Sequence, residues 1–178
     1  MAIQPRLGRF PTGRTSSDHF GFGAVLAQNI ADMKFAEFKP GMVISAGRRS
    51  VTEQDIIEFA TRYDPQWFHT DPERAAASRW QGLIASGWMT CAIAMQLLVT
   101  HVLDGSESIG SPGLEQVKWP NPLRPGEEVA LRVEVLQSRV SSSGKVGIVR
   151  WRWLLTTQTG APVLDIIGTS LFELPASA

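Results

Sequence analysis

The chain has 178 residues, with 17 basic and 17 acidic side chains and therefore no formal net charge at neutral pH. Hydrophobic residues make up 43% and charged residues 19%, which indicates one globular domain with a buried core rather than a disordered chain. Zero net charge without a basic run argues against binding to nucleic acid or to an anionic membrane. The single cysteine, Cys91, excludes an internal disulfide, disfavours a cysteine zinc site and fits a reducing cytoplasm.

Residues 1–34 are predicted to form an N-terminal arm, and residues 35–178 a single domain. Residues 1–17 contain three arginines, no acidic residue and no apolar stretch of signal-peptide length. An organellar transit peptide can have this composition, although a flexible extension explains it more simply. Because the arm has no apolar periodic face and no acid–base pair, we expect it to take no part in the chemistry.

The first expected elements of the domain are a strand and a helix. Residues 42–49 follow a Lys-Pro-Gly turn and are predicted to form the strand. Thr52 is a candidate N-cap with acidic residues behind it, and apolar residues then recur at helical spacing as far as Tyr63. Pro65 disfavours helical geometry at the preceding residue, so the helix is expected to end at about Asp64.

Two more helices are expected before the remaining strands. Asp71 is a candidate cap for a short helix over residues 72–78, with proline at its first position. A long apolar helix is predicted from about Gly87 to Val102. The stretch 88–103 has no charged residue when His101 is neutral, but polar residues interrupt it. A helix buried in a protein core therefore explains it better than a membrane span.

The rest of the chain is predicted to form four successive strands. They cover residues 113–119, 129–135, 149–153 and 163–172, separated by breaks rich in proline, serine, threonine and glycine. Apolar and polar residues alternate in the middle two, as they do in a half-buried sheet. An antiparallel sheet curved around one long apolar helix is an α+β arrangement.

The segment from Tyr63 to Asp71 carries the strongest chemical signal. It places a carboxylate, Asp64, and an imidazole, His69, five residues apart across a turn that contains proline. Such a pair can hold one water molecule, and the carboxylate can orient the imidazole, fix its tautomer and raise its basicity. Without the flanking motif, ending a helix is the better explanation for Asp64, and an ordinary surface position is the better explanation for His69.

This segment resembles the hydratase motif of the MaoC-like dehydratases, which include the (R)-specific enoyl-CoA hydratases. In that motif an Asp precedes an Asn-Pro-like turn and a His at the same spacing. Residues 82–90, 111–114 and 123–127 are similar to later landmarks of the family, and the resemblance extends over about residues 38–173. It implies a hot-dog fold, in which the sheet wraps the long helix, and a homodimer or higher homo-oligomer.

The resemblance also implies roles for particular residues. Asp64 and His69 would form the catalytic pair, adding water to a 2-enoyl thioester to give the (3R)-hydroxyacyl thioester, or removing it. The substrate carbonyl would point at the N-terminus of the long helix, where the Gly87 amide is the expected oxyanion donor. Ser86 would contact the substrate or cap that helix. We expect no metal or redox cofactor, since CoA or acyl carrier protein arrives as part of the substrate.

Three tryptophans around the motif, Trp67, Trp80 and Trp88, are candidate walls of an acyl pocket, with packing in the core or at a dimer interface as the alternative. Two positions depart from the family's pattern. Ser86 stands where many members have His, and Gln66-Trp67 stands in place of Asn-Pro. These changes leave the Asp–His pair intact but bear on the shape of the acyl pocket.

Two other functions are compatible with this fold. A hot-dog thioesterase would use a carboxylate without the paired His, and a non-catalytic acyl-CoA-binding subunit would need neither residue. The presence of His69 at the family's spacing favours the hydratase over both.

Overall fold

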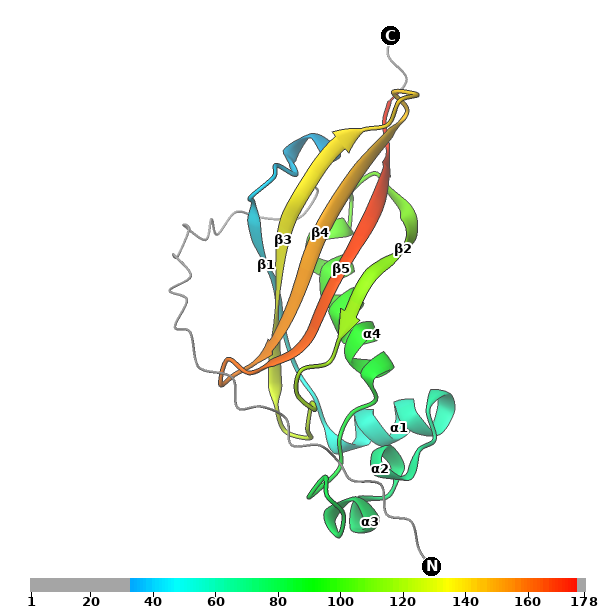
Figure 1. Ribbon diagram of the computed structural model, residues 1–178, viewed down its shortest axis with the longest axis vertical. Helices are drawn as coiled ribbons and strands as arrows, with labels where there is room; N and C mark the ends of the chain where they lie inside the picture. Colours follow the sequence, from blue (N-terminus) through cyan, green and yellow to red (C-terminus); the bar gives the residue numbers. More distant parts are fainter. Residues whose placement is uncertain (1–32, 176–178) are drawn as a thin grey trace, which may run out of the picture.

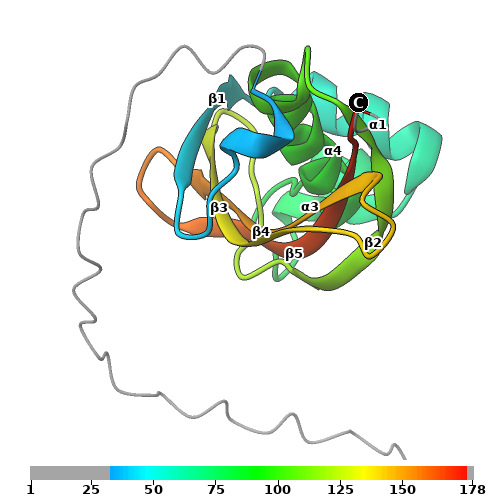
Figure 2. The same cartoon turned by 90° about the horizontal axis from the view of Figure 1, so that it is seen from above.

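Five antiparallel strands form one curved sheet in the order β1-β3-β4-β5-β2, and the sheet wraps around the helix α4 (Figures 1 and 2). The computed structural model describes residues 33–175. Its strands are β1 (Val43–Ser50), β2 (Ser108–Lys118), β3 (Glu128–Val140), β4 (Val146–Thr157) and β5 (Pro162–Glu173). Its helices are the 3₁₀ turn η1 (Phe35–Glu37), α1 (Glu53–Tyr63), α2 (Trp67–Thr70), α3 (Pro72–Ala76), α4 (Gly87–Leu98) and the π-helical turn η2 (Val99–Leu103).

The alternation of side chains along the strands explains how the sheet encloses α4. Every second residue of β4 is buried, including Val149, Trp151 and Trp153, whereas the arginines between them are partly exposed. The buried set joins the buried residues of α4 in one hydrophobic core. The predicted α+β arrangement, with an antiparallel sheet around a long apolar helix, is therefore confirmed.

The long apolar helix begins at Gly87, as predicted, but its α-helical part ends at Leu98 and η2 completes it. His101 in η2 packs over Gly47 of β1, where any side chain would collide with the imidazole ring. His101 therefore has a packing role, and it lies in η2, at the other end of the long helix from Gly87.

Within residues 33–175, no helix has both the length and the apolar character needed to cross a membrane.

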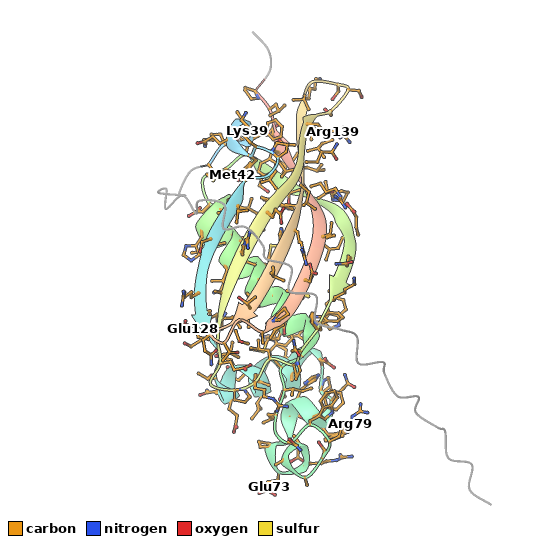
Figure 3. The ribbon with its side chains drawn as sticks, turned by 60° about the vertical axis from the view of Figure 1, so that its left-hand side comes forward. Lys39, Met42, Glu73, Arg79, Glu128 and Arg139 are labelled. Atoms are coloured by element: carbon orange, nitrogen blue, oxygen red, sulfur yellow. The ribbon has the colours of Figure 1, made fainter. Side chains whose placement is uncertain are left out.

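Helices α1 to α3 form a lobe beyond one end of the sheet. Figure 3 shows this lobe, with Glu73 and Arg79 labelled, at the opposite end of the molecule from Lys39 and Arg139. The lobe contacts α4 through α1, and α2 packs against both α1 and α3. Residues between the lobe and α4 are therefore close to the N-terminus of the central helix.

The ends of α1 follow the predicted signals. The Thr52 hydroxyl accepts a hydrogen bond from the Asp55 amide, and the Asp55 carboxylate accepts one from the Thr52 amide, which completes a capping box. The helix ends at Tyr63, one residue before the Asp-Pro pair. Asp64 is consequently the C-cap residue of α1.

Several local predictions were incomplete: β3 and β4 extend beyond the predicted 129–135 and 149–153, and α3 ends at Ala76 rather than at residue 78. The stretch after Pro65, predicted as a turn, contains the single helical turn α2. β2 begins at Ser108, ahead of the predicted start at Gly113, because Pro112 is tolerated in a strand that pairs only with β5 at the edge of the sheet. The predicted arm lies almost entirely outside the described residues, so its role stays a prediction.

Candidate active site

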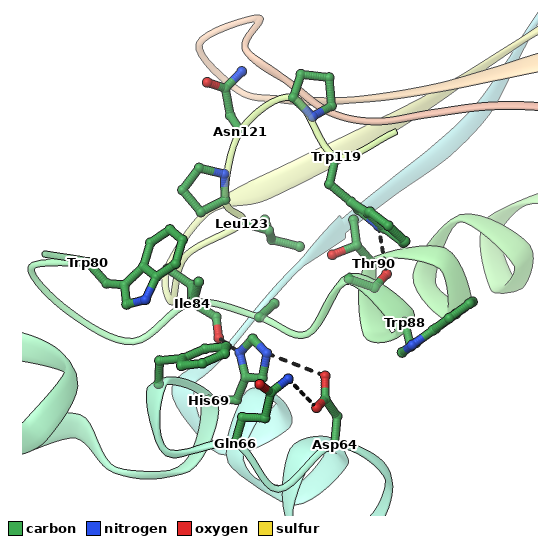
Figure 4. A pocket seen from close by; sticks show the side chains of 15 residues that line it. Asp64, Gln66, His69, Trp80, Ile84, Trp88, Thr90, Trp119, Asn121 and Leu123 are labelled. Carbon is green, nitrogen blue, oxygen red and sulfur yellow. Dashed lines mark hydrogen bonds and ion pairs between the residues drawn. The ribbon is translucent and has the colours of Figure 1, made fainter. Parts of the chain in front are cut away.

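The structure brings Asp64 and His69 together near the N-terminus of α4 (Figure 4). Asp64 ends α1, and α2 turns the chain so that the Nε2 atom of His69 lies 3.4 Å from Asp64 Oδ2. The backbone of Gln66 links the two, because its N–H donates to the Asp64 carbonyl at 2.7 Å and its carbonyl accepts from the His69 N–H at 2.8 Å. The five-residue spacing thus becomes a defined pair.

The orientation of the buried His69 ring determines which nitrogen carries hydrogen. Its Nδ1 atom lies 2.7 Å from the carbonyl oxygen of Ile84. A carbonyl can only accept, so Nδ1 must donate, and Nε2 of the neutral ring bears a lone pair. That lone pair faces the Asp64 carboxylate, another acceptor. A molecule with two O–H donors, such as water, can satisfy both.

Ser86 connects Asp64 to the central helix. Its hydroxyl donates to Asp64 Oδ2 at 2.6 Å and accepts from the Trp88 amide at 3.2 Å. The side chain is fully buried, so neither bond competes with bulk water. Ser86 therefore caps α4, one of its two expected roles, and also holds the carboxylate.

The second oxygen of the Asp64 carboxylate has its own donor. Gln66 Nε2 donates to Asp64 Oδ1 at 2.8 Å. Burial alone would raise the pKa of Asp64, but the hydrogen bonds from Ser86 and Gln66, together with nearby His69, outweigh it and lower that pKa below its ordinary value. The carboxylate is therefore charged at neutral pH.

Gly87 is the first residue of α4 and lines the same groove. In residues 33–175 its N–H donates to no protein group, as expected for the first turn of a helix. The Trp119 ring lies against Gly87, where a Cβ atom would be only 2.7 Å from it, and the indole N–H donates to the Gly87 carbonyl at 2.9 Å. Only glycine leaves room for this contact.

A groove of about 440 Å³ contains these groups. Trp80 and Trp88 are on its wall, as expected. Trp67 lies outside the lining and packs against Phe68, with the Arg74 guanidinium 4.6 Å from its ring centroid. The lining is rich in aromatic and proline side chains and contains no Lys or Arg. It comprises Asp64, Gln66, Phe68, His69, Trp80, Ile84, Ala85, Gly87, Trp88, Thr90, Trp119, Pro120, Asn121, Pro122 and Leu123.

Sequence reasoning missed Phe68 and Trp119 as groove walls, the Ile84 carbonyl as the partner of His69, and the side-chain role of Gln66. The only available signal for Trp119 was an aromatic residue beside a Pro-Asn-Pro break.

Asp71 caps α3 by accepting a hydrogen bond from the Arg74 amide, as predicted, and takes no part in the Asp64–His69 pair. No group of three or more His, Cys, Asp or Glu side chains within residues 33–175 is arranged to hold a metal ion.

Comparison with known proteins identifies a family that the chain matches and several proteins with similar sequences. A family profile described as "MaoC like domain" matches residues 35–153. The Bacillus subtilis protein YdeM is 35% identical over 107 residues, which are 60% of this chain and 76% of that protein. The 3-hydroxyacyl-thioester dehydratase Z of Mycobacterium tuberculosis is 35% identical over 82 residues, which are 45% of this chain and 54% of that enzyme.

Solved structures share the arrangement of elements. The MaoC-like dehydratase from Rhodospirillum rubrum is 36% identical, with a TM-score of 0.72 over 79% of this chain and 97% of that one. The (R)-hydratase PhaJ1 from Pseudomonas aeruginosa is 22% identical, with a TM-score of 0.67 over 84% of this chain and 96% of that one. The similarity to PhaJ1 shows that the two proteins share a fold and nothing more.

The lowered pKa of Asp64 predicts a particular acid sensitivity. The folded protein binds this proton less readily than the unfolded chain, so ionised Asp64 contributes stability above its ordinary pKa of about 4. That contribution is lost as the pH falls through the lowered pKa. We expect the wild type to lose stability relative to Asp64→Asn below about pH 4, measured as the free energy of unfolding in urea at several pH values. An identical pH dependence of the two proteins would contradict this.

Proposed function

Since the chain belongs to the MaoC-like domain family, whose profile matches residues 35–153, we propose that it catalyses the reversible hydration of a 2-enoyl thioester to the (3R)-hydroxyacyl thioester. Family membership confirms the resemblance seen in the sequence, and the fold is the hot-dog fold of its MaoC-like neighbours. A relative named as a 3-hydroxyacyl-thioester dehydratase and a similar structure named as a MaoC-like dehydratase support a hydro-lyase. The observation that carries the specific reaction is the Asp64–His69 pair beside the start of α4.

The pair would hold the attacking water. Asp64 Oδ2 and His69 Nε2 are two acceptors on one side of the groove, and one water can donate an O–H to each. Both hydrogens would then be engaged, and the oxygen lone pairs would be free for C3 of the substrate. Ser86 and Gln66 fix the carboxylate, and Ile84 fixes the imidazole, so the water site is set before the substrate arrives.

The proposed hydration moves one proton from the water to C2 by way of His69. His69 Nε2 takes one proton as the water O–H bond breaks, and the oxygen forms its bond to C3. The electron pair of the C2–C3 double bond moves through the conjugated carbonyl to the thioester oxygen, where the Gly87 N–H and the positive end of α4 stabilise the charge. His69 then delivers its proton to C2, and the carbonyl re-forms. Asp64 remains charged throughout, and dehydration is the reverse.

The carrier of the acyl group enters as substrate. CoA and acyl carrier protein present the same thioester, so the pair and the Gly87 amide can act on either one. A screen of enoyl-CoA esters of different length, followed by loss of the conjugated thioester absorbance, would identify the acyl group. The same reactions assayed for free thiol would detect hydrolysis, the expected activity of a hot-dog thioesterase.

The dyad is tested by two substitutions. Asp64→Asn keeps size and shape but removes the charge, and His69→Ala removes the proton acceptor. Each should lower kcat by about 10²–10⁴-fold, the usual effect of a positioned acid or base. The double variant should be little worse than either single one, because both residues act on one water. Asp71→Asn, which alters the cap of α3, is the matched control and should cost little activity. Near-normal turnover in both variants would show that groups other than this pair carry the reaction, whereas a wild type without turnover would favour a binding subunit.

The product should have the (3R) configuration. The acceptors of the pair lie on one side of the groove, so water would reach a single face of a bound alkene. Which face this is follows from the resemblance to the (R)-specific hydratases. Chiral chromatography of the product from crotonyl-CoA, or from a longer ester that the protein hydrates better, measures it. Predominance of the (3S) product would contradict the assignment.

We also propose that the protein is a homodimer. Large apolar side chains are exposed on α4, on η2 and on the edge strand β2: Trp88, Met95, Val99, Ile109 and Leu114. The three on the helix recur at spacings of seven and four residues, which places them on one stripe. β2 pairs with β5 on one side only, so its other edge is open to a second chain.

Light scattering at micromolar concentration should therefore give twice the mass of one chain. Met95→Glu should weaken the dimer, because it places a charge in the exposed stripe. Val140→Glu is the matched control, since Val140 is also exposed but lies on β3, which β4 and β5 separate from the edge strand β2. A wild-type protein that is strictly monomeric, or equal effects of the two substitutions, would count against this dimer.

A further inference from the structure

Gln66 occupies a position where the family's motif has Asn, and it contacts both members of the catalytic pair. Its backbone N–H and carbonyl bond to Asp64 and His69, and its side-chain amide donates to Asp64 Oδ1 at 2.8 Å. We propose that Gln66 is a positioning residue that keeps the Asp64 carboxylate charged and correctly rotated for the bound water. The proposal rests on the hydration described above.

The geometry explains why two donors are needed. Ser86 restrains Oδ2 at 2.6 Å, the oxygen that also faces His69. A carboxylate held at one oxygen alone can still rotate about its bond to Cβ. The Gln66 amide restrains the other oxygen, so together the two bonds fix the plane of the carboxylate. Rotation would take Oδ2 out of reach of a water that also bonds to His69.

The charges around Asp64 make the neutral donors important. His69 from α2 is the titratable group that faces it, and no Lys or Arg of residues 33–175 forms an ion pair with it. From the start of α4 only the hydroxyl of Ser86 contacts the carboxylate. The hydrogen bonds from Ser86 and Gln66 therefore favour the charged form in the absence of a permanent cation.

The backbone of Gln66 makes its side chain well placed for this role. It lies between α1 and α2, and its carbonyl also accepts from the Thr70 hydroxyl at 3.2 Å. These bonds fix the backbone of the residue although it is exposed, so only side-chain rotamer freedom is lost when the amide binds Asp64. An exposed side chain held in this way can act on the carboxylate without belonging to the core.

The chain offers a matched control. Gln54 on α1 is also exposed and donates to a carboxylate, that of Glu58, at 2.7 Å, but it lies outside the groove. Gln66→Ala should lower kcat roughly tenfold with little change in KM, the effect of losing one hydrogen bond to a charged group. Gln54→Ala should leave both constants unchanged. Aspartate-selective carbon NMR should show a higher pKa for Asp64 in Gln66→Ala than in the wild type.

A pH profile separates positioning from a structural role. In Gln66→Glu the new carboxyl group repels Asp64 when ionised, but once protonated it can donate an O–H in place of the amide. The kcat/KM of Gln66→Glu relative to the wild type should therefore be lowest at high pH and rise as the pH falls. Gln66→Ala has no such group, so its ratio should show no such recovery.

The results distinguish this proposal from the proposed function. If Asp64→Asn loses activity while Gln66→Ala keeps wild-type kcat and an unchanged Asp64 pKa, the positioning role is wrong and the dyad stands. If Gln66→Glu and Gln66→Ala follow the same profile, the amide does not act through its hydrogen bond. If the wild type hydrates no enoyl thioester, the proposed function fails, whereas the NMR titration still tests whether Gln66 lowers the pKa of Asp64.

Discussion

The hydrogen bond between His69 Nδ1 and the Ile84 carbonyl is the constraint on which the site depends. It requires hydrogen on Nδ1 and therefore directs the lone pair of Nε2 toward Asp64. In the other tautomer, with hydrogen on Nε2, the pair would present a donor and an acceptor to each other and would close into a direct hydrogen bond. The observed orientation instead leaves two acceptors that a substrate water can join. A buried backbone carbonyl thus determines the chemistry available to the side chains.

That carbonyl is itself placed by the fold. The segment before α4 is tied on both sides, because the Ile84 N–H donates to Phe68 of α2 at 3.3 Å and the Ala85 N–H donates to Leu123 at 2.8 Å. Leu123 precedes β3, so the tie extends to the sheet. Ser86 follows in the same segment and caps α4. Three elements that are distant in the sequence therefore meet at one point, and the core around α4 keeps them there.

Local signals predicted the parts of this arrangement that depend on neighbouring residues. The Asp-Pro pair indicated the end of α1, and Ser86-Gly87 the start of α4, because caps and proline act within one helical turn. The Asp64–His69 spacing indicated a pair but not its geometry, since α2 was taken for a turn. The walls of the groove were less accessible, because Trp119 reaches Gly87 only after the sheet has wrapped the helix. Contacts between residues so far apart in the sequence depend on the whole fold rather than on the local spacing of residue types.

The departures from the family's motif also have a physical meaning. Ser86 is a neutral hydroxyl where many members have an imidazole, so it can hold the carboxylate without adding a second titratable group. Gln66 does the same at the other oxygen. Asp64 then stays ionised at neutral pH without a charged donor on either oxygen. An arginine in either place would also keep Asp64 charged, but its fork of N–H groups would occupy the oxygens that the water needs. Neutral donors leave one lone pair of Oδ2 free, and that lone pair is what the carboxylate contributes to binding the water.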